Sequence, residues 1–188
     1  MASSITSLLT SAERGDEPAT DALFAALYAE LHRLAQSQLR RSGSGLTIGA
    51  TTLLHEAYLD MARRESTAFP DRGRFMAYAA KVMRRLVIDY ARTRHAQKRG
   101  GAFELTTLPS EVSASAPDGE ELARIGEAVD ELAREEPELA QVVDLKFFCG
   151  FSFAEIGTLH GLSERTIQRQ WRKARLHLHR TLRVGAVS

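Results

Sequence analysis

The residues best suited to chemistry lie near the C-terminus, in the stretch SERTIQRQWRK (163–173). Ile167 and Trp171 stand one helical turn apart, so both are expected to face a core. This leaves six residues facing largely outward: Arg165, Thr166, Gln168, Arg169, Arg172 and Lys173. Arg and Gln can hydrogen-bond to base edges in a DNA groove, whereas Lys, Arg and Thr also bind phosphates. The spacing therefore predicts a helix face that reads nucleic acid.

The residues before this stretch predict the turn that such a helix needs. An apolar pattern over 153–160 indicates a short helix that ends at Gly161, and Leu162 is expected to pack into the core. Ser163 is a favourable N-cap for the next helix. Two helices joined by a glycine-containing turn form a helix-turn-helix, whose second helix can enter the major groove. The alternative is an ordinary helical hairpin with a solvated basic face.

Charge is distributed unevenly, although the formal net charge is only +1. Residues 81–99 carry seven Lys or Arg and one Asp, and residues 164–183 carry seven Lys or Arg and one Glu. Residues 104–144 between them carry twelve acids and only two arginines. Two basic segments of this density favour a polyanionic partner, although solvated helix faces would produce a similar pattern.

Catalytic and metal-binding patterns are weak in this chain. His55 and Glu56 begin like the HExxH zinc motif, but Leu59 occupies the position of its second histidine. His177 and His179 are two residues apart on a predicted helix and point in different directions, so they are poor co-ligands. Gly-rich phosphate loops and nucleophile elbows are also missing from the sequence. We expect no enzyme activity, no cofactor and no metal site.

The elements that position these residues are predicted to be helices throughout. Apolar residues recur at helical spacing in six segments: 23–34, 53–61, 75–90, 122–132, 139–147 and 167–182. Residues 97–118 are rich in Gly, Ser, Thr, Pro and Ala, which is typical of a linker. The prediction is an all-α protein with two small helical domains, 1–96 and 119–188, joined by the flexible linker 97–118. Each domain is small, so each core is expected to be thin.

The composition favours a cytoplasmic protein. No stretch approaches the ~18 apolar residues of a membrane span, and the N-terminal sequence has no basic region typical of a signal peptide. A single cysteine, Cys149, excludes an internal disulfide. We therefore expect no membrane partner.

Long stretches of this sequence carry a family resemblance. They are LLHEAYLDMARR (53–64), FMAYAAKVMRRLVIDYARTRHAQKR (75–99) and LAQVVDLKFFCGFSFAEIGTLHGLSERTIQRQWRKAR (139–175). With these motifs the chain resembles the extracytoplasmic-function (ECF) sigma factors, the two-domain promoter-recognition subunits of bacterial RNA polymerase. The resemblance implies two partners: core RNA polymerase, through its β′ clamp coiled coil and β flap, and promoter DNA.

The resemblance also implies where each partner binds. The N-terminal domain would bind the clamp through five residues: Leu53, Leu54, Glu56, Leu59 and Asp60. It would melt the −10 element and hold the strand through another five: Lys81, Arg84, Arg85, Arg92 and Arg94. Phe75 and Tyr78 lie near the implied melting surface, but their helical spacing places them on the core stripe. The helix-turn-helix, with the six residues of 165–173 given above, would read the −35 element.

The front of the clamp-binding helix departs from the family pattern. Relatives place an acidic cluster before this helix, whereas the aligned residues here are GATT (49–52). Phosphorylation of Thr51 or Thr52 would add about −1.5 to −2 charges at a helix N-terminus, which favours anions. The hypothesis is activation by a Ser/Thr kinase, in place of release from an anti-sigma factor. The alternative is that one threonine is simply a helix cap.

Two other functions compete with promoter recognition. One is a stand-alone helix-turn-helix regulator that binds operator DNA without polymerase. The basic segment 81–99 and the long tether favour a transcription initiation factor instead. The other is an adaptor that binds polymerase or a kinase but no DNA, which the arginine-rich segment 164–183 argues against.

Overall fold

The computed structural model describes residues 5–43, 46–63, 69–99 and 119–184, and these residues are helical with short connections. No strand occurs in these ranges, which confirms the all-α prediction. The helices are α1 (Ile5–Glu13), α2 (Glu17–Arg41), α3 (Ala50–Ala62), α4 (Arg72–Arg99), α5 (Gly119–Glu135), α6 (Pro137–Val143), the π-helical segment η1 (Asp144–Phe148), α7 (Phe153–His160) and α8 (Glu164–Val184).

The N-terminal half is a bundle of α1 to α4 built around the apolar stripes of α2 and α4. Leu23, Leu27 and Leu31 of α2 are at most 1% exposed. Phe75 of α4 is 2% exposed and stacks edge-on against Phe24, so it belongs to the core. Repetition of apolar residues every three or four positions gives each helix one buried face, which holds the bundle together.

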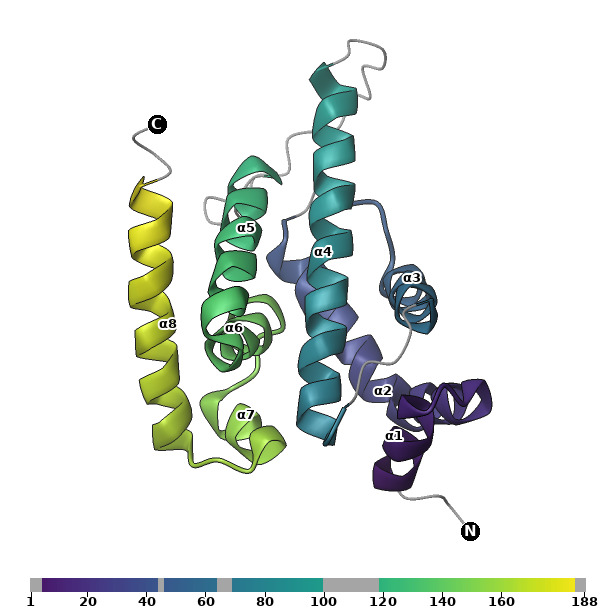
Figure 1. The fold of residues 1–188 in the computed structure, drawn as a ribbon. Coiled ribbons are helices and arrows are strands. Elements are labelled where there is room, and N and C mark those ends of the chain that lie inside the picture. Colours follow the sequence, from purple (N-terminus) through teal and green to yellow (C-terminus); the bar gives the residue numbers. More distant parts are fainter. Residues whose placement is uncertain (1–4, 44–45, 64–68, 100–118, 185–188) are drawn as a thin grey trace.

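The C-terminal half consists of α5 to α8 and contains the predicted helix-turn-helix. Figure 1 shows α5 between α4 and α8, so that it contacts the N-terminal half on one side and the long C-terminal helix on the other. Leu122, Val129 and Leu132 of α5 are at most 1% exposed. This helix is therefore amphipathic, with an apolar stripe inside and acidic residues on the remaining surface.

The two halves pack together through one continuous hydrophobic cluster. Helix α4 contacts α5, α6, η1 and α7, so residues far apart in the sequence share a core. The expected linker, 97–118, begins inside α4, because that helix continues to Arg99. Residues 100–118 lie outside the described residues. Two thin cores thus become one larger core, which buries a greater share of the apolar surface.

None of the helices in the described ranges combines the length and the apolar character that a membrane crossing requires.

Candidate nucleic-acid interface

The helix-turn-helix is formed by α7, a short turn and α8. Gly161 has φ +65°, a left-handed conformation that glycine adopts without strain, and it ends α7. The backbone N–H of Leu162 then donates to the carbonyl of Gly157 at 2.9 Å. A Cβ on Gly157 would lie 2.7 Å from the Leu162 oxygen, so this turn requires glycine at position 157. The prediction that Leu162 packs into the core is wrong, because its side chain is 42% exposed and the backbone anchors the turn.

The start of α7 is fixed by a capping box. Ser152 Oγ accepts from the backbone N–H of Glu155 at 3.1 Å, and Glu155 Oε2 accepts from the backbone N–H of Ser152 at 2.7 Å. The second of these bonds lowers the pKa of the Glu155 carboxyl. Two otherwise unpaired backbone donors are satisfied in this way, and the first helix of the motif is held in register.

Replacing Ser152 with alanine is expected to lower the free energy of unfolding by about 1 kcal/mol, the usual cost of losing an N-cap. Urea unfolding followed by circular dichroism measures this difference. Thr158→Ala is the matched control, because Thr158 is exposed on the same helix and its hydroxyl donates only to the carbonyl of Ala154. An equal loss of stability in both variants would contradict a specific role for the cap.

The inner face of α8 is anchored while its outer face stays accessible. Ile167 and Ala174 are fully buried, and Trp171 is half-buried near Phe153. Ser163 caps the helix as predicted from the sequence: its hydroxyl accepts from the backbone N–H of Thr166 at 3.2 Å and lies 2.8 Å from the Thr166 hydroxyl. These contacts fix the rotation of α8 and therefore which residues it presents.

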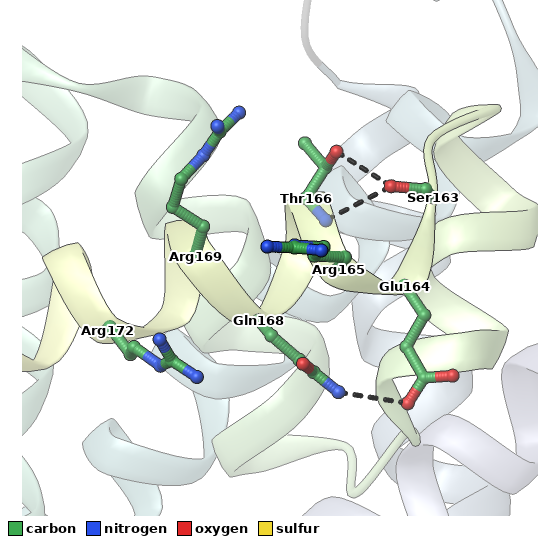
Figure 2. Close-up of a pocket in the computed structure, with 7 residues that line it drawn as sticks. All are labelled: Ser163, Glu164, Arg165, Thr166, Gln168, Arg169 and Arg172. Atoms are coloured by element: carbon green, nitrogen blue, oxygen red, sulfur yellow. Dashed lines mark hydrogen bonds between the residues drawn. The ribbon is translucent and has the colours of Figure 1, made fainter.

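The outer face of α8 carries the six residues predicted to read DNA. Four of them are exposed: Arg165, Arg169, Arg172 and Lys173. The other two, Thr166 and Gln168, are half-buried. All except Lys173 line one surface hollow, together with Ser163 and Glu164 (Figure 2). Gln168 Nε2 donates to Glu164 Oε1 at 3.1 Å, so a base edge would compete with Glu164 for this amide. The hollow offers several charged and uncharged donors on one helix face, the arrangement that base and phosphate contacts need.

The basic residues of α4 are arranged differently from the prediction. Arg84 is only 1% exposed, and its three nitrogen donors are bound within the protein. Arg84 is therefore not accessible to DNA in this arrangement of the two halves. Arg92 is exposed but paired with Glu127 of α5. Of the other three residues predicted to contact DNA, Arg85 is exposed, and Lys81 and Arg94 are half-buried.

Two of the residues expected to bind polymerase belong to the core. Leu53 and Leu54 of α3 are 0% and 4% exposed, so their side chains are not accessible to a partner in this structure. The apolar stripe of α3 is used to pack against α2 and α4 instead. The remaining three are half-buried: Glu56, Leu59 and Asp60.

The front of α3 exposes both threonines. Gly49 is the N-cap, so neither Thr51 nor Thr52 acts as the cap that the sequence allowed. Both side chains are exposed, and Thr51 Oγ1 lies 3.4 Å from His32 Nε2 of α2. The first turn of α3 contains no acidic residue.

Sequence reasoning missed the residues that tie the halves together. Asp144 and Asp130 contact Arg84 of the other half, and Gln38 contacts Cys149 of the other half. Asp144 interrupts the apolar run LAQVVDLKFF (139–148), and a charge inside such a run is a signal that a buried partner exists. Among the described residues, no group of three or more His, Cys, Asp or Glu could hold a metal ion.

An all-helical protein with an exposed, arginine-rich recognition helix belongs to the helix-turn-helix class of nucleic-acid-binding proteins. The sequence profile described as ECF sigma factor matches residues 2–184, and the chain therefore belongs to the ECF sigma factor family. Sigma factors act with RNA polymerase in transcription initiation, and this family is one of transcription factors rather than enzymes. A comparison with curated protein sequences finds no significant match.

Proposed function

We propose that this chain directs core RNA polymerase to promoters by reading the −35 element with α8 and capturing the −10 element with α4. The observation that carries the proposal is the hollow on α8, where three exposed arginines surround Thr166 and Gln168. Arginine forms two parallel hydrogen bonds with guanine in the major groove, and threonine contacts bases or phosphates. Membership of the sigma factor family supports polymerase as the partner.

Run-off transcription with core polymerase tests this proposal. Candidate promoters are taken from DNA fragments that the full-length protein and core polymerase select together from a random pool. Transcripts that start at one position and need the protein are the expected result. If the protein binds DNA fragments tightly but no initiation follows, the stand-alone regulator is the better description.

The proposed −10 surface includes three basic residues of α4, which are Lys81, Arg85 and Arg94. Arg85 is exposed on α4, while Lys81 and Arg94 are half-buried on the same helix. Cationic side chains along one helix can follow the backbone of a single strand, and unstacked bases add further binding energy. Arg84 and Arg92 join this surface only if their contacts with α5 and η1 are broken.

The front of α3 is the proposed contact with the β′ clamp. The clamp would meet three half-buried residues of α3, which are Glu56, Leu59 and Asp60. Phosphorylated Thr51 or Thr52 would supply the missing negative charge. The exposed hydroxyl groups at the helix N-terminus support this role, since a phosphate there meets the positive end of the helix dipole. A Ser/Thr kinase is then the proposed activator, in place of an anti-sigma factor.

Replacing Thr51 and Thr52 with aspartate is expected to tighten binding to a β′ clamp coiled-coil fragment. Two exposed charge pairs are worth up to about 2 kcal/mol together, which predicts an affinity gain of about two- to thirtyfold. Isothermal titration calorimetry compares this variant with wild type and with the double alanine variant. Thr47→Asp is the matched control, because Thr47 is exposed but precedes the helix. Equal affinities for the double aspartate and double alanine variants would remove support for the phosphorylation switch.

A further inference from the structure

Acidic residues of the C-terminal half cover one face of α4. Arg84 Nε donates to Asp144 Oδ1 at 2.6 Å, its Nη2 donates to Asp130 Oδ1 at 2.9 Å, and its Nη1 donates to the Gly126 carbonyl at 3.1 Å. The guanidinium also lies 5.5 Å from the centre of the Phe148 ring. Burial lowers the pKa of Arg84, but the carboxylates of Asp144 and Asp130 more than offset this, so the pKa is raised and the group stays charged. Every nitrogen of this side chain is thus used by α5 or η1.

The same face of α4 is in close apolar contact with α5. A Cβ on Gly126 would lie 2.3 Å from Ile88 Cδ1, so the Ile88 side chain packs into the space that this glycine leaves. About one turn further along α4, a Cβ on Gly119 would lie 3.5 Å from the Cβ of Ala91, at van der Waals distance. Ala91 and Ile88 are both less than 9% exposed. The face is therefore covered by tightly fitted apolar groups as well as by paired charges.

Two further sets of contacts join the N-terminal and C-terminal halves. A Cβ on Gly73 would lie 2.2 Å from the backbone oxygen of Leu159 in α7, so α4 and α7 touch through their backbones. Gln38 Nε2 donates to the Ala80 carbonyl at 2.7 Å and lies 3.4 Å from Cys149 Sγ. Cys149 belongs to the C-terminal half and is buried under Gln38 of the N-terminal half.

We propose that this packed arrangement is an autoinhibited state, in which α5 and η1 occupy the −10-binding face of α4 and must leave it before promoter melting. The inference rests on the proposed −10 function of α4. Asp144, Asp130 and Glu127 hold the guanidinium groups of Arg84 and Arg92, the groups that strand phosphates would bind. DNA and the acidic groups of α5 and η1 compete for the same cations, so only one of them can be bound at a time.

Opening requires no break inside a described helix. Helices α4 and α5 are joined in the chain by residues 100–118, and α5 keeps its contacts with α6 and α8 when it leaves α4. The outer face of α8 is exposed in the closed state, so −35 reading does not need opening. The closed state therefore blocks one DNA contact and leaves the other available.

A reversible disulfide between α4 and α5 tests the proposal directly. The Cβ separation of 3.5 Å between positions 91 and 119 lies in the range of natural disulfides. The double variant Ala91→Cys/Gly119→Cys is expected to form the bond under mild oxidation. The oxidised protein should lose binding to a −10 single strand and promoter-specific transcription while it still binds −35 duplex. Reduction should restore both activities.

Each outcome of the disulfide experiment is informative. Failure of the bond to form would overturn the packed arrangement, and equal transcription by the oxidised and reduced proteins would overturn the autoinhibition. If the reduced protein and wild type direct no transcription, the proposed function itself fails and this inference fails with it. The two single-cysteine variants control for the substitutions.

A variant that opens the interface supplies the opposite test. Gly73→Ala places a methyl group against the Leu159 backbone and should separate α7 from α4 without changing any charge. Gly119→Ala is the matched control, because its methyl group meets Ala91 at 3.4–3.6 Å, an ordinary contact distance. The Gly73 variant should bind a −10 single strand more tightly than the control, since a larger fraction of the protein is open. Equal affinities, with both variants folded by circular dichroism, would contradict the proposal.

Cys149 reports opening without DNA. Burial raises the pKa of its thiol to about 12, so the closed protein should react very slowly with a thiol reagent at pH 8. The Gly73→Ala variant should react faster than Gly119→Ala, because separation of the halves exposes the sulfur to solvent and removes the burial that raises its pKa. Equal rates in the two variants would show that the methyl group at position 73 does not open the interface.

Discussion

Replacing Asp144 with alanine is expected to lower the free energy of unfolding by about 3 kcal/mol, the lower end of the cost of removing one partner from a buried ion pair. The carboxylate is 3% exposed and lies 2.6 Å from Arg84 Nε. Without it a buried guanidinium loses its closest counter-charge, and cannot recover full hydration. The cost stays at the lower end because Asp130 and the Gly126 carbonyl still bind Arg84.

Urea unfolding near neutral pH measures this loss, with Asp130→Ala as the matched control. Asp130 binds the same guanidinium, but its side chain is 36% exposed, so its loss should cost about 1 kcal/mol or less. The double variant Arg84→Met/Asp144→Leu removes both charges and should recover much of the stability. Equal midpoints for Asp144→Ala and wild type would mean that the pair does not form in solution. The autoinhibited state would then lose its strongest contact.

Helical periodicity predicted most of the elements, because each of those helices buries one apolar face, but α1 was not among the predicted segments. Most residues of the predicted stripes of α2, α4 and α5 are buried, but two aromatic members are exposed: Tyr28 is 49% and Tyr90 is 39% exposed. The sequence also predicted that Ser163 caps α8 and that Gly161 ends α7, since each position has a specific backbone requirement. These features depend on local interactions, which a sequence displays directly.

The burial of Arg84 depends on a partner sixty residues away in sequence, so charge counting could not show that its guanidinium is covered in the packed structure. On a helix, Arg84 lies in line with Ala80 and Ile88, one turn before and one turn after it. That position on an apolar stripe was a local signal of burial. Only the fold shows that Asp144 and Asp130 lie opposite it.

The residues of α3 show a different limit. Leu53 and Leu54 lie in the apolar stripe of the helix, and the family resemblance assigned them to a partner surface. The bundle uses them in its own core, since a short helix must bury its apolar face to remain folded. The cap was also ambiguous, because Gly49, Thr51 and Thr52 are all acceptable at an N-cap position.

The second large effect is expected at the recognition helix, where Arg169→Ala should weaken binding to the selected −35 duplex by about 1–3 kcal/mol. Arg169 is exposed and lines the hollow between Arg165 and Arg172, and truncation leaves the buried contacts of Ile167 and Ala174 intact (Figure 2). The protein should therefore keep its stability while it loses affinity. Fluorescence anisotropy with duplexes chosen from a random pool measures the change.

Arg180→Ala is the matched control for this loss. Arg180 is exposed on the same helix but lies outside the hollow, about three turns beyond Arg169. A contact with phosphate alone would weaken binding to all sequences equally and reduce the salt dependence, whereas a contact with a base relaxes the preference at one position of the duplex. Arg169→Ala should therefore lower the ratio of specific to non-specific affinity, and Arg180→Ala should leave that ratio unchanged. If both variants weaken every duplex alike, α8 holds DNA only by charge, and the −35 specificity must come from residues other than Arg169.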